Sequence, residues 1–201
     1  MKQNYSYCNF LSITSEQETT MARLTDINAE ELPEKDRDLL KLPLNLYRQL
    51  VNSPDGARAF RSLGHHIRFG SSLDPRLREM AIIQIGYLAK SEYEYAHHIE
   101  LGLEQFGLSI EDVHAITTET SGEKSELSEL DKTVLRAARD MFSNLKISDT
   151  DFDFLKTQFT NAHVVELILA IAFYCAVVRV LATLEIEIEP EYKKILQQFP
   201  F

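Results

Sequence analysis

Three residue types that can exchange protons come together around Glu94 and His98. Ser91, Glu94 and His98 follow the spacing S-x-x-E-x-x-x-H, and Glu79 adds a second carboxylate on the segment before them. On a helix, Glu94 and His98 lie one turn apart on one face, close enough to share a proton or a ligand. Carboxylates gathered around an imidazole are suited to acid–base catalysis. The spacing therefore predicts a proton-transfer site formed by His98, Glu94, Glu79 and Ser91.

Two other interpretations use the same residues. Ser91 and Glu94 have the spacing of a capping box, in which each side chain bonds the backbone N–H of the other residue. His98 would then be a structural histidine bonded to a backbone carbonyl. A metal site made of Glu94, His97, His98 and Glu100 is disfavoured, because adjacent histidines point about 100° apart on a helix. The sequence favours no metal site but leaves the structural and catalytic interpretations open.

The chain is predicted to be helical nearly throughout. Ser53-Pro54 and Asp74-Pro75 are typical helix starts, and Gly107 is a typical helix end. Only residues 185–189 alternate with a period of two, and no hairpin signal is present. The predicted helices cover residues 42–51, 54–68, 75–88, 91–106, about 109–118, 128–141, 149–159 and 162–184. These segments predict an all-α bundle of about seven to eight helices in a single domain, residues 21–201, with residues 1–20 outside the fold.

Composition narrows the class of protein. The chain has 201 residues and a net charge of -10, which argues against a nucleic-acid-binding surface. The most apolar stretch, residues 164–184, is interrupted by Glu166 and Arg179, so we expect a buried core helix and no membrane span. The two cysteines, Cys8 and Cys175, lie in very different contexts, so a disulfide framework is not expected. No signal peptide is recognised, and a cytoplasmic protein is predicted.

Beyond the spacing itself, residues 73–82 and 91–98 resemble the carboxymuconolactone decarboxylase-like family, which includes the AhpD alkylhydroperoxidases. The resemblance extends over about residues 42–189. The family pattern has a leading glutamate followed, twelve residues on, by C-x-x-C-x-x-x-H. Glu79 matches the glutamate, His98 matches the histidine, and Ser91 and Glu94 stand at the two cysteine positions. Residues 173–179 resemble the family's late Y-N-x-x-x-R block, with Cys175 in place of the asparagine.

The resemblance implies an AhpD-like fold but changes the expected chemistry. In the peroxidase branch, the cysteine pair reduces the peroxide. A serine hydroxyl is far less acidic than a thiol and does not cycle through a sulfenate or disulfide. The decarboxylase branch also lacks the cysteine pair and implies loss of carbon dioxide from a carboxylated lactone, followed by protonation of the resulting dienolate. There, His98 would be the acid and base, with Glu94 or Glu79 tuning it.

The resemblance further implies a small-molecule substrate and a homo-oligomer, trimeric or hexameric, with sites near subunit interfaces. Arg68 and Tyr95 are the predicted substrate-binding residues. Arg76 is a second possible anion holder, although we expect it to be solvated. No cofactor is expected. A peroxide-consuming antioxidant protein, disfavoured by the missing cysteines, and a non-catalytic ligand-binding oligomer remain the alternatives.

Overall fold

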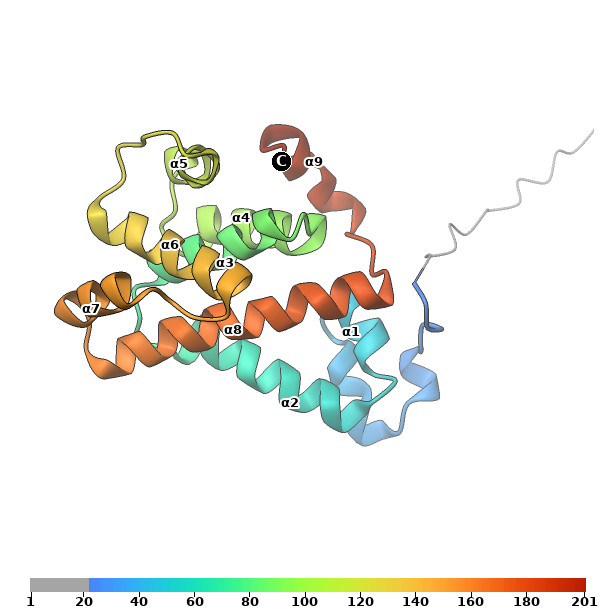
Figure 1. Cartoon of the computed structure of the whole chain (residues 1–201). Coiled ribbons are helices and arrows are strands. Elements are labelled where there is room, and N and C mark those ends of the chain that lie inside the picture. The colour runs from blue at the N-terminus through green and yellow to red at the C-terminus, as the bar shows by residue number, and fades with distance from the viewer. Residues whose placement is uncertain (1–21) are drawn as a thin grey trace, which may run out of the picture.

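The computed structural model describes residues 22–201, which form an all-α domain (Figure 1). The prediction made for residues 1–20 lies outside the described residues. The helices are α1 (Asn45–Leu50), α2 (Pro54–His65), α3 (Pro75–Leu88), α4 (Glu92–Gln105), α5 (Ile110–Ser121), α6 (Glu129–Asn144), α7 (Asp149–Gln158), α8 (Asn161–Leu184) and α9 (Lys193–Gln198). Three 3-10 turns cover Ala29–Glu31, Glu34–Leu40 and Pro190–Tyr192, and a π-helical turn covers His66–Gly70. The all-α prediction is confirmed, and the described residues contain no strand.

Eight of these nine α-helices correspond to the eight predicted segments. The ninth, α9, was not predicted and is only six residues long. The helix predicted from residue 54 to about Arg68 ends earlier, at His65, and Arg68 lies instead in the π-helical turn. The period-two segment, residues 185–189, is not a strand but an extended connection that leads from α8 to the last 3-10 turn.

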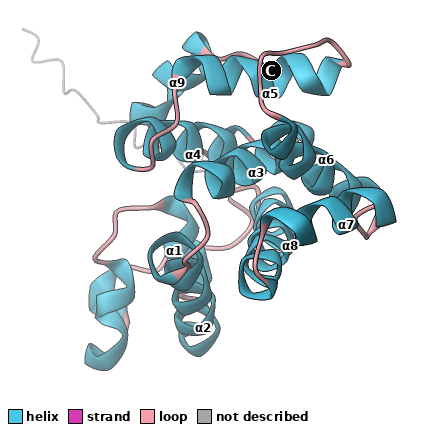
Figure 2. Ribbon diagram, turned by 90° about the vertical axis from the view of Figure 1, so that its left-hand side faces the viewer, coloured by secondary structure: helices cyan, strands magenta, loops and turns pink. Residues whose placement is uncertain are grey.

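Helix α3 is the central element of the domain. Both views place α3 and α4 in the middle, with α5 and α9 on one side and α8 on the other (Figures 1 and 2). Every residue from Leu77 to Gly86 is buried, so α3 has no solvent-facing side. This buried stretch nevertheless includes Arg78, Glu79 and Gln84. Buried polar groups require partners, so the polar residues of α3 constrain what packs around it.

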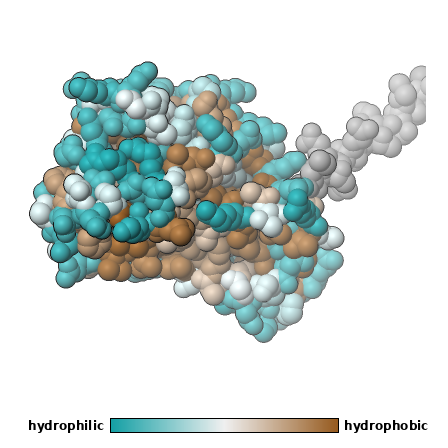
Figure 3. All heavy atoms as spheres, in the orientation of Figure 1, coloured by the Kyte–Doolittle hydropathy of each residue, from teal (hydrophilic) through white to brown (hydrophobic). Residues whose placement is uncertain are grey.

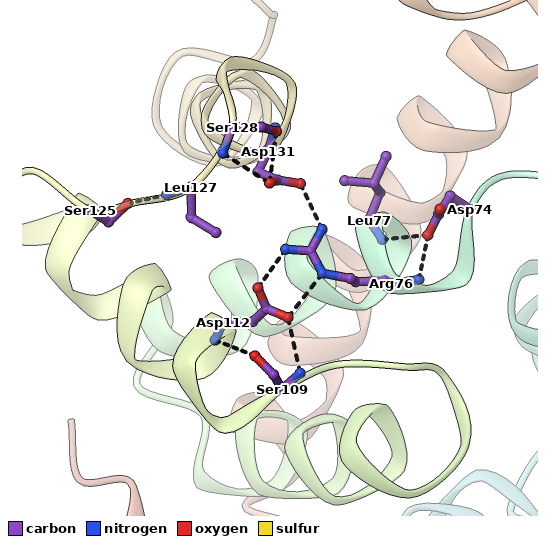
Figure 4. A network of polar contacts seen from close by, with 9 residues as sticks. All are labelled: Asp74, Arg76, Leu77, Ser109, Asp112, Ser125, Leu127, Ser128 and Asp131. Carbon is purple, nitrogen blue, oxygen red and sulfur yellow. Dashed lines mark hydrogen bonds and ion pairs between the residues drawn. The ribbon is translucent and has the colours of Figure 1, made fainter.

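An arginine at the start of α3 joins three helix N-termini (Figure 4). The guanidinium of Arg76 lies 2.5 Å from Asp112 Oδ1 and 2.8 Å from Asp131 Oδ1. Each aspartate also completes the capping box of its own helix, with Ser109 in α5 and Ser128 in α6. Arg76 is thus neither solvated nor free to hold a substrate anion, in contrast to both expectations. Instead, it fixes the first turns of α3, α5 and α6 relative to one another.

Helix α8 contributes one face to the core and leaves the other exposed. Buried residues such as Leu167, Ile171 and Tyr174 alternate along it with exposed Val165 and Leu169. By length and composition alone, α8 would suffice to cross a membrane, contrary to the expectation that no segment is apolar enough. Its packing against α3, α6 and α7 identifies it as a core helix of this domain, as predicted.

The C-terminal segment folds back over α4 (Figure 1). Ile195 and Phe199 are buried in the main core. Glu189 is also buried, and it accepts hydrogen bonds from the backbone N–H of Asn45 (2.6 Å) and from the hydroxyl of Tyr93 (3.1 Å). This segment therefore covers one side of the helix that carries the predicted site.

We predict that Arg76→Met lowers the free energy of unfolding by about 2 kcal/mol, because it leaves two aspartates without their cation. The loss should be smaller than for a fully buried pair, since the Arg76 side chain is 30% exposed. Arg48→Met is the matched control: Arg48 is exposed, and no carboxylate within residues 22–201 pairs with it. Denaturant titration of both variants measures the difference. Equal stability of the two variants would contradict a structural role for Arg76.

Candidate active site

The turn between α3 and α4 brings the two helices unusually close. Lys90 adopts a left-handed backbone conformation (φ 50°), and the N–H of Ser91 donates to the carbonyl of Gly86 at 3.0 Å. A β-carbon on Gly86 would lie only 2.9 Å from the backbone nitrogen of Tyr95. Because glycine has no side chain, α4 can pack directly on α3 at this point. The close contact lets side chains from the two helices meet further along.

Glu79, His98 and Glu94 form a continuous chain of close polar contacts in the core. His98 Nδ1 lies 2.6 Å from Glu79 Oε2, and His98 Nε2 lies 3.0 Å from Glu94 Oε1. The three residues are at most 4% exposed. The structure thus brings together three of the four predicted catalytic residues. Their catalytic role itself stays a prediction.

The geometry favours the imidazolium form of His98. Burial alone would lower the pKa of His98, but the charges and hydrogen bonds of Glu79 and Glu94 outweigh burial and raise the pKa to about 9. Both ring nitrogens face carboxylate oxygens, and an imidazole donates at both nitrogens only when it is protonated. At neutral pH, His98 is therefore a cation held between two anions.

Arg78 supplies the second buried cation of the cluster. Its Nε donates to Glu79 Oε1 at 3.1 Å, and its guanidinium lies over the ring of Phe106, 4.4 Å from the centroid. Two carboxylates, one guanidinium and one imidazolium give a net charge of zero. If His98 lost its proton, the buried cluster would carry an uncompensated negative charge, which the low-dielectric core disfavours.

Glu94 and His98 lie at the wall of a small cavity of about 60 Å³. The edge of the His98 ring meets Tyr174 of α8, with the two centroids 4.7 Å apart. Burial, followed by the charge of Glu94, raises the pKa of Tyr174 well above its usual value, so its hydroxyl stays protonated. The rest of the wall is a mixture of aromatic, cationic and small residues, including Tyr47, Phe60, Gly64, Arg68 and Phe173.

Ser91 does not belong to this cavity. Its hydroxyl accepts the backbone N–H of Glu94 at 3.5 Å and so caps α4, while its side chain lines a separate groove near the end of α8. The predicted capping box is only half correct, because the Glu94 side chain bonds His98 rather than the N–H of Ser91. That N–H already donates to Gly86. The position of Ser91 does not support the catalytic role predicted for it.

The predictions for Tyr95 and His97 also need correction. Tyr95 is completely buried on the far side of α4, where it stacks against Phe201, so it cannot contact a ligand in the cavity. On a regular helix whose apolar stripe contains Tyr95 and Ile99, His97 would turn toward solvent. Instead its ring lies between Tyr93 (4.2 Å) and Tyr192 (3.7 Å), with Nε2 3.0 Å from Glu189. The C-terminal segment, which the sequence pattern did not reveal, is what covers His97.

Arg68, the other predicted substrate-binding residue, does line the cavity. Several wall residues were not predicted, namely Tyr47, Gly64, Tyr93 and Tyr174. Tyr174 lies within residues 173–179, the late block that resembles the family, so the resemblance could have indicated that it lies near the site. Tyr47 lies in a short helix far away in sequence, and only the tertiary structure shows that it faces Glu94.

The architecture is that of AhpD-like helical proteins. An uncharacterized peroxidase-related protein with an alkylhydroperoxidase AhpD core, from Ralstonia eutropha JMP134, is similar with a TM-score of 0.70 and 18% identity over 87% of this chain and 95% of the other. A peroxidase-related protein from Silicibacter sp. TM1040 gives a TM-score of 0.67 and 18% identity over 90% and 97%. The debrominase Bmp8, in complex with 2,3,4-tribromopyrrole, gives 0.72 and 16% over 89% and 99%.

Sequence comparison supports the family resemblance. Residues 54–121 match the Carboxymuconolactone decarboxylase family, and this region includes Glu79, Glu94 and His98. This match and the shared AhpD-like fold support the resemblance to the AhpD-like carboxymuconolactone decarboxylase family. No curated protein matches the whole sequence significantly.

We predict that His98 stabilises the fold in a pH-dependent way. Its pKa in the folded protein, about 9, lies above the ordinary value of 6.5, so its contribution to stability is fully present below 6.5 and is lost as the pH rises through 9. Glu79→Gln should lower the pKa of His98, because it removes the largest interaction that raises this pKa.

NMR titration of the His98 ring measures this pKa directly, and denaturant titration across the same pH range measures the stability. Glu100→Gln is the matched control, since Glu100 lies on α4 but pairs with Lys194 instead. A His98 that titrates near its ordinary value in the unmutated protein would show that the two carboxylates do not hold its proton.

Proposed function

We propose that the protein is an enzyme that transfers a proton to or from a small carboxylated lactone or a related small molecule. The observation that carries the proposal is the buried His98 ring, held between the carboxylates of Glu79 and Glu94 at the wall of a cavity. Burying a cation between two carboxylates is an energetically costly way to stabilise a core, because each charge loses its hydration. Such clusters are common where a proton must be stored and delivered.

The three residues have different parts in the proposed reaction. Glu94 and His98 both line the cavity, whereas Glu79 is completely buried behind His98. In a decarboxylation, the bond between the ring carbon and the carboxylate breaks, carbon dioxide leaves, and the electron pair remains on the ring as a dienolate. The Nε2 proton of His98 then reaches the ring carbon, directly or through Glu94. Glu79 stabilises the imidazolium before the transfer, and afterwards it accepts the remaining Nδ1–H of the neutral ring until His98 is protonated again.

Thiol chemistry is not favoured at this site. Ser91 and Glu94 occupy the positions where the peroxidase branch has cysteines, and neither can cycle between thiol and disulfide. Within residues 22–201, the one cysteine is Cys175, which lies half-buried on α8. Burial raises the pKa of its thiol and makes it a weaker nucleophile. The same argument disfavours a thiol-dependent dehalogenation, although the similar debrominase binds a small aromatic ring.

We predict that Glu94→Gln and His98→Gln each lower kcat for carboxymuconolactone about 100-fold or more, the range expected for loss of a general acid or base. Ser91→Ala is the control: it removes a helix cap at a cost of about 1 kcal/mol in stability but leaves the cavity intact. Steady-state assays at saturating substrate separate kcat from KM. Full turnover by His98→Gln would eliminate the proposed mechanism.

A peroxide assay tests the disfavoured alternative. If the protein consumes peroxide and Cys175→Ser abolishes this activity, the proton-transfer proposal would have to give way to thiol chemistry.

The exposed face of α8 supports the proposed homo-oligomer. Val165 and Leu169, which are 53% and 41% exposed, lie on one stripe of the helix with Ala172 and Ala176. A broad apolar band runs along this side of the molecule (Figure 3). The stripe carries no charge between residues 167 and 178, so two copies can meet along it without burying an unpaired ion.

We predict that Leu169→Lys shifts the protein toward the monomer, because two or more copies would have to bury the new charge. Light scattering coupled to size-exclusion chromatography measures the mass in solution. Gln105→Lys adds the same charge at an exposed position on α4 and should leave the mass unchanged. A Leu169→Lys variant with the same oligomeric mass would place the interface elsewhere.

A further inference from the structure

The cavity at Glu94 and His98 adjoins a much larger surface groove. The groove has a volume of about 660 Å³ and is lined by the segment before α1, the outer side of α2 and the π-helical turn. Leu44 and Arg68 line both the groove and the inner cavity. The two residues therefore form the boundary between the buried Glu–His cluster and the open surface.

Volume decides which compartment can hold a ligand. The inner cavity, about 60 Å³, has room for only a few water molecules. A ring-sized molecule does not fit in it without displacing its walls. The groove is about ten times larger and can take a small organic molecule, so the body of a ligand belongs there. Only its reacting end would pass the boundary toward Glu94.

The charges of the groove point to an anionic ligand. Two of its arginines are already neutralised: Arg58 pairs with Asp36 and Asp38, and Arg61 pairs with Asp38 at 2.6 Å. The hydrogen bonds from these two arginines lower the pKa of Asp38 to about 2, so the pairs stay charged. Arg68 is the third arginine that lines the groove, and it is the one of the three without such a pair to the residues that the structure describes.

Arg68 has no carboxylate within ion-pair distance among residues 22–201. Its Nε donates to the carbonyl of Gly64 at 3.2 Å, and its guanidinium also interacts with the hydroxyl of Tyr47; neither contact neutralises its charge. Arg48 also lacks a carboxylate partner in the described part of the chain, so what distinguishes Arg68 is its position at the boundary of the two cavities. A guanidinium in this position suits a carboxylate that binds to it in bidentate fashion.

The backbone at Arg68 is also irregular. Residues His66–Gly70 form a π-helical turn, closed by a hydrogen bond from the N–H of Ser71 to the carbonyl of His66 at 2.8 Å. Single π-helical turns occur frequently at functional sites, because they redirect side chains that a regular helix would align with the preceding turn. This turn presents Arg68 to the cavities and leaves Phe69 on the surface, 54% exposed.

We propose that this groove binds a small organic anion with an apolar body, and that Arg68 pairs with its carboxylate. Phe69 and Leu42, which is 46% exposed, supply apolar surface for the body of the ligand. Bound in this way, the ligand extends past Leu44 and Arg68 toward Glu94 and His98. The link to turnover rests on the proposed function, whereas the anion site itself does not.

Binding of benzoate tests the proposal without any turnover. Isothermal titration calorimetry or ligand-observed NMR measures its affinity for the full chain and for Arg68→Met, Arg68→Lys and Arg48→Met. Benzamide serves as the neutral analogue, and inorganic phosphate as an anion without an apolar body. Circular dichroism and denaturant titration verify that each variant is folded.

We expect benzoate to bind the unmutated protein and its affinity to fall about tenfold or more in Arg68→Met, because that variant loses a charge-assisted hydrogen bond. Arg68→Lys should retain part of the affinity because it keeps the charge, and Arg48→Met should retain all of it. Benzamide should bind more weakly than benzoate to the unmutated protein, with an affinity that does not depend on Arg68.

Undetectable benzoate binding to the unmutated protein, or unchanged affinity in Arg68→Met, would overturn the anion site. Phosphate binding as tight as that of benzoate would contradict the proposal that the groove selects anions with an apolar body. These outcomes are separate from those of the turnover assay. Arg68-dependent benzoate binding together with unaltered turnover in His98→Gln would sustain the anion site and refute the proposed mechanism. Benzoate binding that does not depend on Arg68, together with lost turnover in His98→Gln, would refute the anion site and sustain the mechanism.

Discussion

Charge neutrality inside the core is the constraint on which the rest of the site depends. Glu79 and Glu94 are buried where a lone carboxylate would be very costly, so each must be paired. The imidazolium of His98 is within hydrogen-bond distance of both, and Arg78 adds the remaining positive charge. The cluster is therefore neutral only while His98 holds its proton. This coupling makes the protonation of one histidine depend on the packing of two helices, and it keeps a transferable proton in place at neutral pH.

The helical framework must satisfy this constraint to within a few tenths of an ångström. Glu79 and His98 come from different helices, and a hydrogen bond of 2.6 Å between them requires α3 and α4 to pack closely. Gly86 makes that approach possible, because any β-carbon there would meet the backbone of Tyr95. Arg76 fixes the other end of α3 to α5 and α6. The ends of α3 are thus positioned independently, and Glu79, the carboxylate that pairs with His98, lies between the two fixed points.

Patterns of neighbouring residues correctly predicted the features that depend only on neighbouring residues. Helix starts such as Asp74-Pro75 follow from capping and the fixed backbone of proline, and the pairing of Glu94 with His98 follows from helical spacing. Contacts between distant segments could not be derived in this way. The sequence pattern did not show that residues 185–201 fold over His97, that Tyr95 turns away from the cavity, or that two aspartates from other helices claim Arg76. The expected role of each of these residues was wrong because its partner lies far away in the sequence.

The replacement of both cysteine positions now has a structural explanation. At the first position, Ser91 retains only the ability to cap α4 and faces a different groove. At the second, Glu94 keeps contact with the histidine one turn away but introduces a negative charge that a neutral thiol would not carry. That charge raises the affinity of His98 for its proton. The resemblance implies a histidine that assists thiol deprotonation, whereas in the function proposed here the histidine itself holds the proton, and such a site suits acid–base rather than redox chemistry.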